Sequence, residues 1–162
     1  MASYKLGMAF KGSRPRISRK VAVDGGMTLG DLDWNIRSIF GWSDFHLHRF
    51  SIPMYGTAGP ADEHGEYDCD EDEVTIDDIA GMSFSYVYDF GDWLELDIKF
   101  LKGDPGAVGF QVLEEKGAAP PEDFGGTRHF CYCVAAAKDP GHPDHDECLQ
   151  RLIDFGVEPE EL

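Results

Sequence analysis

Hydrophobic residues alternate with polar or small residues over residues 4–10 and again over residues 17–23. A period of two is typical of a β-strand with one buried face. The segment between the two runs, Lys-Gly-Ser-Arg-Pro, has the composition of a turn. The pattern therefore predicts a β-hairpin over residues 4–23, which the run Asp24-Gly25-Gly26 ends.

The spacing of apolar residues becomes helical after this hairpin. Thr28 can cap a helix N-terminus, and Asp31 three residues later can complete a capping box. Gly41 stands where a left-handed C-terminal cap belongs. These signals predict a helix over residues 29–40. Its apolar face consists of Leu29, Leu32, Ile36, Ile39 and Phe40.

A second hairpin is predicted over residues 84–100, turning near Gly91, because aromatic and β-branched residues recur there with a period of two. The same alternation predicts that Tyr86, Tyr88 and Phe90 bury their rings. The remaining segments carry weaker signals. We predict a strand over 45–52, a loop over 53–73, a strand or helical turn over 74–79, a further candidate strand over 108–113, irregular structure over 120–126, and helices over 130–138 and 143–155.

The order of these elements indicates the fold class. A hairpin, a helix, a strand, a second hairpin and terminal helices predict one α+β domain over residues 1–162. We expect a mixed or antiparallel sheet with the helices on one face. The opening ββαβ order is like that of a β-grasp.

Charge limits the kinds of partner. The chain has 31 acidic and 14 basic residues and a net charge of −17. Proteins bind DNA largely by neutralising phosphates with Lys and Arg, so we expect no binding to duplex DNA. The N-terminus lacks the apolar region of a signal peptide, and no apolar run is long enough to span a membrane. The four cysteines do not have the spacing of a disulfide-bonded scaffold. We therefore expect a cytoplasmic protein with reduced cysteines.

Two aspartates, Asp89 and Asp92, flank the predicted turn at Gly91, and two interpretations of them remain open. Aspartates in turns accept backbone amide hydrogen bonds, so a structural role is sufficient. We favour that role and predict that each accepts such bonds from its own turn or from residues 120–126. The alternative is catalysis, for which Glu122 and Asp123 would complete a carboxylate cluster if residues 120–126 fold beside the hairpin.

Imidazole and thiol groups offer two candidate metal sites. His46 and His48 fall on one face of the predicted strand 45–52, where they could bind a metal or transfer protons. We favour histidines that are satisfied by hydrogen bonds. Near the C-terminus, a zinc ion would take His142, His145 and Cys148 as ligands. We expect no structural metal and no cofactor, because Cys131 and Cys133 point to opposite sides of the predicted helix.

Five short motifs occur in a characteristic order: Pro15-Arg16-Ile17-Ser18-Arg19, Phe40-Gly41-Trp42, His46-Leu47-His48-Arg49-Phe50, Tyr88-Asp89-Phe90-Gly91-Asp92 and Pro120-Pro121-Glu122-Asp123-Phe124-Gly125-Gly126. Together they resemble the plasmid pRiA4b ORF-3-like family, some of whose members are labelled insertion-element passenger proteins or resolvases. The resemblance implies an α+β fold of unestablished activity, associated with plasmids or mobile elements. This chain has Ser18 where the family usually has Trp, and Phe124 where it commonly has Cys. The family's Trp-x-His after the second hairpin turn is here Leu94-Glu95-Leu96.

From these observations we expect a binding module without catalytic activity. It would bind a protein or peptide at a sheet edge or beside the second hairpin. We expect a monomer or a weak homo-oligomer. A hydrolase or metal-dependent enzyme using the carboxylate cluster is the alternative, and a nucleic-acid-associated protein is a third. The candidate binding residues are Trp42, His46, His48, Tyr88, Asp89, Asp92, Glu122 and Asp123.

Overall fold

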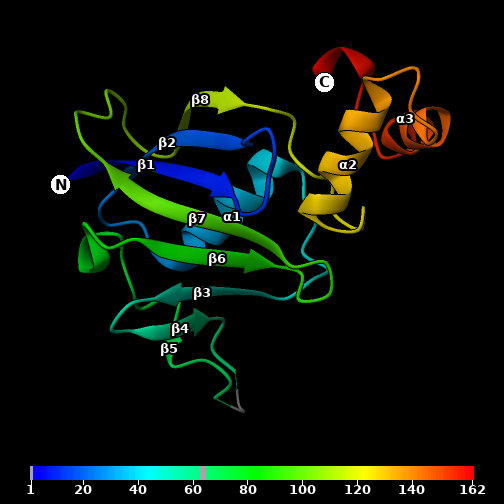
Figure 1. The fold of residues 1–162 in the computed structure, drawn as a ribbon. Helices are drawn as coiled ribbons and strands as arrows, with labels where there is room; N and C mark the ends of the chain where they lie inside the picture. Colours follow the sequence, from blue (N-terminus) through cyan, green and yellow to red (C-terminus); the bar gives the residue numbers. More distant parts are fainter. Residues whose placement is uncertain (1, 63–64) are drawn as a thin grey trace.

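The computed structural model describes residues 2–62 and 65–162, and in this part of the chain one eight-stranded sheet organises the fold (Figure 1). The strand order is β5-β4-β3-β6-β7-β1-β2-β8. All neighbouring strands run antiparallel except β4 and β5, so the sheet is mixed. The predicted α+β class is confirmed. The strands are β1 (Ser3–Phe10), β2 (Ser18–Asp24), β3 (His48–Ile52), β4 (Gly56–Gly59), β5 (Cys69–Asp70), β6 (Phe84–Tyr88), β7 (Leu94–Leu101) and β8 (Gln111–Lys116).

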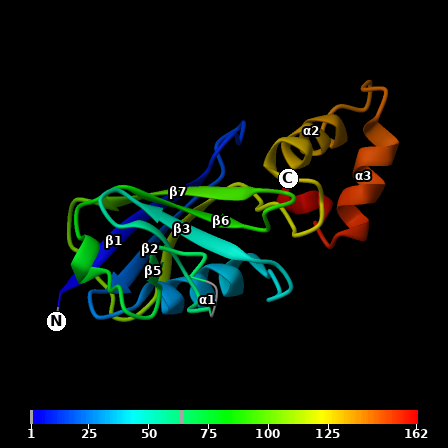
Figure 2. The ribbon, with the colours of Figure 1, turned by 90° about the horizontal axis from the view of Figure 1, so that it is seen from below.

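The first helix, α1 (Leu29–Phe40), begins and ends as its sequence predicts. The Thr28 hydroxyl accepts a hydrogen bond from the Asp31 amide, the Asp31 carboxylate accepts one from the Thr28 amide, and Gly41 has a φ of 70°. The helix lies along one face of the sheet, as Figure 2 shows from the side. Leu29, Leu32 and Ile36 of its apolar face are buried, and Ile39 and Phe40 are partly buried. This helix and the inner faces of the strands enclose the hydrophobic core.

The C-terminal helices α2 (Thr127–Ala137) and α3 (His145–Asp154) pack together beyond one end of the strands, so α1 alone of these three helices lies on a face of the sheet (Figures 1 and 2). The described residues also form two 3-10 turns, η1 (Asp77–Ile79) and η2 (Pro159–Glu161). Because α2 follows directly on residues 120–126, its position fixes where that loop reaches the sheet.

The likeness to a β-grasp is not confirmed. In that arrangement the strand after the helix would lie beside the first strand. Here β3 pairs with β4 and β6, and both β6 and β7 stand between β3 and β1. The second hairpin has therefore inserted between the first hairpin and the strand that follows the helix.

Several predicted boundaries were wrong. Residues 53–73 contain β4 and β5, which lack apolar alternation; β4 pairs with β3, as at Phe50 and Ala58, and β5 pairs with β4. Residues 74–79 form one bridge at Thr75 and the 3-10 turn η1, so the helical turn, one of the two predicted alternatives, is confirmed. The predicted strand 108–113 lies at Gln111–Lys116 instead. The helix predicted over 130–138 begins earlier, at Thr127. Its N-cap is Gly126, which has no side chain to cap the helix, so the sequence carries no capping signal at this start.

Candidate functional site

Three loops meet at the end of the sheet nearest α2, and we call their junction the three-loop site. It comprises residues 41–47 after α1, residues 89–93 between β6 and β7, and residues 120–126 before α2. The Asp89 amide donates to the Leu47 carbonyl at 2.8 Å, which joins the first two loops. The Gly125 amide donates to Asp92 Oδ2 at 3.0 Å, which joins the second and third. The loop 120–126 thus folds beside the hairpin.

The inner wall of this site is an aromatic and carboxylate cluster. The Trp42 ring stacks on the Tyr88 ring at 4.9 Å, and its Nε1 donates to the Pro120 carbonyl. The Tyr88 hydroxyl donates to Glu122 Oε2 at 2.8 Å. The Ser43 amide and hydroxyl donate to the two oxygens of Glu122 at 2.9 and 3.0 Å. The hydrogen bonds from Trp42 and Ser43 therefore join the first loop to Pro120 and Glu122 of the third loop.

These contacts oppose proton exchange in the cluster. Partial burial raises the pKa of Glu122, but hydrogen bonds from Ser43 and Tyr88 outweigh burial and hold that pKa below its usual value. Burial, and then the hydrogen bond to Glu122, raise the pKa of the Tyr88 phenol. The carboxylate consequently stays ionised and the phenol stays protonated at neutral pH.

His46 lies on the outer side of the site between two carboxylates. Its Nε2 is 2.8 Å from Asp123 Oδ1, and its Nδ1 is 3.6 Å from Asp89 Oδ1. The side chain of Asp123 is 62% exposed, whereas that of Asp89 is 10% exposed. One possible ligand atom from each residue lies within 4.8 Å of the others. The arrangement could hold a cation at the surface.

Asp89 and Asp92 bond as the sequence predicts. Asp89 Oδ1 accepts from the Gly91 amide of its own turn at 2.9 Å, and Asp92 accepts from Gly125 of residues 120–126. Asp89 also has a φ of 65°, a left-handed conformation that Asp tolerates better than most residues. Both carboxylates therefore hold the backbone of the site in place.

Large apolar side chains are exposed on two of the three loops, and the sequence did not identify them as site residues. Phe45 is 89% exposed and Leu47 is 61% exposed, both on the first loop. Phe90 and Trp93, on the second loop, are 38% and 43% exposed. The predicted burial of the Phe90 ring was wrong, because β6 ends at Tyr88 and the left-handed Asp89 turns the chain outward. We call Phe45, Leu47, Phe90 and Trp93 the apolar rim.

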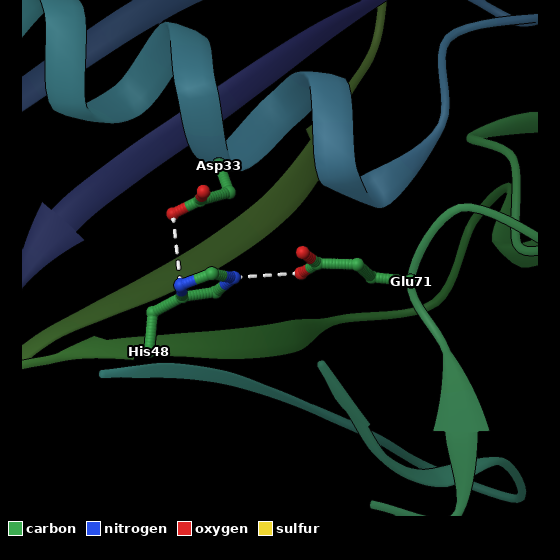
Figure 3. Close-up of side chains that lie close together, drawn as sticks. All are labelled: Asp33, His48 and Glu71. Atoms are coloured by element: carbon green, nitrogen blue, oxygen red, sulfur yellow. Dashed lines mark hydrogen bonds and ion pairs between the residues drawn. The ribbon is translucent and has the colours of Figure 1, made fainter. Parts of the chain in front are cut away.

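His48 does not join His46. It lies on β3 with its side chain buried on the α1 side of the sheet, between Asp33 of α1 and Glu71 (Figure 3). Its Nε2 is 2.7 Å from Glu71 Oε2, and its Nδ1 is 3.5 Å from Asp33 Oδ1. Asp33 is further bound by Arg37 and by the Tyr86 hydroxyl. The prediction that His46 and His48 share one face of a strand over 45–52 was wrong, because β3 begins only at His48 and His46 lies in the loop before it.

One signal could have identified part of that network. Asp33 interrupts the predicted apolar face of α1, four residues after Leu29 and three before Ile36, where a charge needs a buried partner. Glu71 lies in a run of acidic residues and has no such signal.

The zinc candidates near the C-terminus do not share one site. His145 Nδ1 lies 3.0 Å from the Ala136 carbonyl, and His142 Nδ1 accepts the Asp144 amide. Cys148 instead approaches Cys133. Within the described residues, three potential ligands come together only at Asp33/His48/Glu71 and at His46/Asp89/Asp123.

Comparison with known proteins gives a consistent result. The family model described as plasmid pRiA4b ORF-3-like protein matches residues 2–161. The uncharacterized protein y4hQ of Sinorhizobium fredii (strain NBRC 101917 / NGR234) is 34% identical over 145 residues, which cover 84% of this chain and 73% of that protein. A crystal structure of a protein of unknown function, MM3350 from Methanosarcina mazei Go1, is 26% identical, with a TM-score of 0.79, 99% of this chain covered and 97% of that one. No helix among the described residues has the length and apolar character to cross a membrane.

Proposed function

The chain belongs to the plasmid pRiA4b ORF-3-like family, and we propose that it is a non-catalytic binding module that takes a basic, partly apolar peptide segment of another protein at the three-loop site. The observation that carries this proposal is the apolar rim, which stands exposed beside the carboxylates of the same loops.

The rim supplies the apolar half of such an interface. Exposed large apolar side chains are unremarkable singly, but a group of them on one surface marks interaction sites. The Phe90 and Trp93 rings lie 6.0 Å apart, and the Arg49 guanidinium packs 5.4 and 5.2 Å from them, which limits their freedom before a partner arrives. Preordered aromatic residues are the usual anchors of protein interfaces.

The charge beside the rim selects the partner. The side chains of Asp44 and Asp123 are 79% and 62% exposed, and both lie on the loops of the site. With a net charge of −17 over the whole chain, the field attracts a cationic segment and repels an anionic one. A peptide that alternates Lys or Arg with apolar residues fits both features.

The inner carboxylates favour binding over catalysis. A general acid or base works best with a pKa near the working pH. The pKa of Glu122 is lowered instead, and Asp89 and Asp92 are occupied with backbone amides. These groups have the properties of a scaffold that holds the loops.

Fluorescence polarisation with paired synthetic peptides tests the proposal. One peptide alternates Lys with Leu and Phe, and its partner carries Glu at each Lys position. We expect the Lys peptide alone to bind, and Phe45→Ala to weaken binding by about tenfold, or about 1.4 kcal/mol. Trp34→Ala is the matched control, because Trp34 is 61% exposed on α1, outside the site. Equal binding of both peptides, or equal effects of both substitutions, would overturn the proposal.

A second candidate, a metal-dependent hydrolase, is favoured by one observation, the close approach of His46, Asp89 and Asp123. An imidazole with two carboxylates is a ligand set that suits Zn²⁺ or Mn²⁺. Asp92 and Glu122 would then supply nearby carboxylates. Calorimetric titration with each ion tests it, with Asp123→Asn expected to abolish binding and Asp44→Asn as the control on the neighbouring loop. Absence of binding heat with the parent protein would eliminate this candidate.

A further inference from the structure

Cys133 of α2 and Cys148 of α3 face each other across the contact between these helices. Their Sγ atoms are 3.0 Å apart, and the two residues are 1% and 5% exposed. A disulfide bond is about 2.05 Å long, so the sulfurs need to approach by only about 1 Å. The helices already hold the pair in position for a bond.

We propose that Cys133 and Cys148 are a modification site, a dithiol that a small peroxide converts into a reversible disulfide joining α2 to α3. The inference is independent of the binding function proposed above. It concerns the helical pair beyond the end of the sheet, and no residue of the apolar rim takes part in it.

The other two cysteines are placed differently. Cys69 lies in β5, where its thiol donates to the Tyr55 carbonyl. Cys131 is half-buried on α2, two residues before Cys133, and the helix turns its side chain to another side. Of the four cysteines in the chain, only Cys133 and Cys148 are hydrogen-bonded to each other in the described residues.

The surroundings of the pair determine which oxidant can act. Burial, and then the neighbouring Cys148, raise the pKa of the Cys133 thiol to about 12, so this thiol is protonated at neutral pH and its reaction with an oxidant, which requires the thiolate, is slow. Bulky disulfides cannot reach sulfurs that are almost fully enclosed. Hydrogen peroxide, which is little larger than water, is the class of oxidant that fits.

The reaction balances with one peroxide for each pair. One sulfur attacks a peroxide oxygen, the O–O bond breaks, and a sulfenic acid and one water form. The second sulfur then attacks the sulfenic sulfur, the S–S bond forms, the S–O bond breaks, and a second water leaves. The two thiol protons end in the two water molecules, both sulfurs are oxidised, and the peroxide is reduced.

The bond would stabilise the helices beneath the third loop of the site. Arg151 of α3 donates to the Phe124 carbonyl at 2.7 Å, and α2 starts where that loop ends. A bond from residue 133 to residue 148 closes a loop of 148 − 133 = 15 residues. Closing such a loop removes freedom from the unfolded chain, which raises the melting temperature by about 6–12 °C for a chain of this size.

Thiol counting by mass spectrometry tests the inference. The purified protein is treated with hydrogen peroxide, denatured, alkylated and weighed, then digested without reduction. We expect two of the four thiols to be protected, a cross-link between the peptides of Cys133 and Cys148, and a rise in melting temperature that dithiothreitol reverses.

Single variants sharpen the test. Cys133→Ser and Cys148→Ser should lose the cross-link, whereas Cys131→Ser, the matched control on α2, should keep it. If a serine variant does not fold, the peptide map of the parent protein still decides. Four alkylated thiols after treatment, a cross-link to Cys69 or Cys131, or oxygen addition without a cross-link would each overturn the inference.

Discussion

Replacing His48 by Leu tests the buried network of Figure 3 most directly. The side chains of His48 and Glu71 are each 8% exposed, and 2.7 Å separates Nε2 from Oε2. Leucine fills a comparable volume but has no hydrogen-bond donor, so the Glu71 carboxylate would stay buried without a partner. Asp33 keeps Arg37 and the Tyr86 hydroxyl and is affected less.

The size of the effect follows from that asymmetry. Removing the partner of a buried carboxylate costs about 3–5 kcal/mol when the carboxylate remains charged in a low-dielectric interior. That is a large share of a typical domain's stability of about 5–15 kcal/mol. Replacing both partners, as in His48→Leu/Glu71→Leu, removes the uncompensated charge, so we expect the double variant to be more stable than His48→Leu alone.

Urea unfolding of the parent, the two single variants and the double variant measures the coupling as a double-mutant cycle. Glu73→Leu is the matched control, since Glu73 is exposed two residues along the same acidic run, and it should change stability by no more than about 0.5 kcal/mol. If His48→Leu lies within about 1 kcal/mol of the parent, the reasoning about buried charge is refuted.

Four further outcomes follow. Asp89→Ala and Asp92→Ala should each lower the free energy of unfolding by about 1–3 kcal/mol, since backbone amides lose their acceptors; two variants as stable as the parent by thermal unfolding would contradict this. The pKa of Glu122 is lower in the folded protein than its unfolded value of about 4.5, so the ionised carboxylate stabilises the fold fully at a pH above 4.5. This stabilisation is lost as the pH falls through the folded pKa, so the melting temperatures of the parent and Glu122→Gln should converge below pH 4.5. The parent should give no duplex DNA binding at physiological salt in a fluorescence titration, given the net charge of −17. Dialysis against a chelator should leave the melting temperature unchanged, and one tightly held equivalent of zinc in the purified protein would contradict that expectation.

Local signals account for the elements that the sequence predicted well. The capping box at Thr28 and the left-handed Gly41 act within one turn of α1, so the helix boundaries are readable from neighbours in the chain. The strands β4 and β5 are different, because β4 has the sequence Gly-Thr-Ala-Gly and is ordered by its partner β3. Stabilisation by pairing with another strand leaves no hydrophobic pattern in β4 itself.

The difference between local and long-range interactions also explains which parts of the three-loop site could be predicted. The turn at Asp89 could be predicted, since its carboxylate bonds to Gly91 two residues away. The contact of His46 with Asp123 spans 77 residues, and the bond from Trp42 to Pro120 spans 78. Such contacts depend on where α2 places the third loop.

The exposed rim shows where alternation fails as a guide. A period of two predicts burial only while the strand continues, and β6 ends at Tyr88. Past that point the left-handed Asp89 reverses the direction of the chain, so Phe90 leaves the face that Tyr86 and Tyr88 share. Asp89 both ends the alternation and accepts the hydrogen bond that holds the turn. The Phe90 ring that follows it is exposed and can contact a partner. The exposure of Phe90 in the apolar rim and the hydrogen-bonded turn at Gly91 therefore both result from the conformation of Asp89.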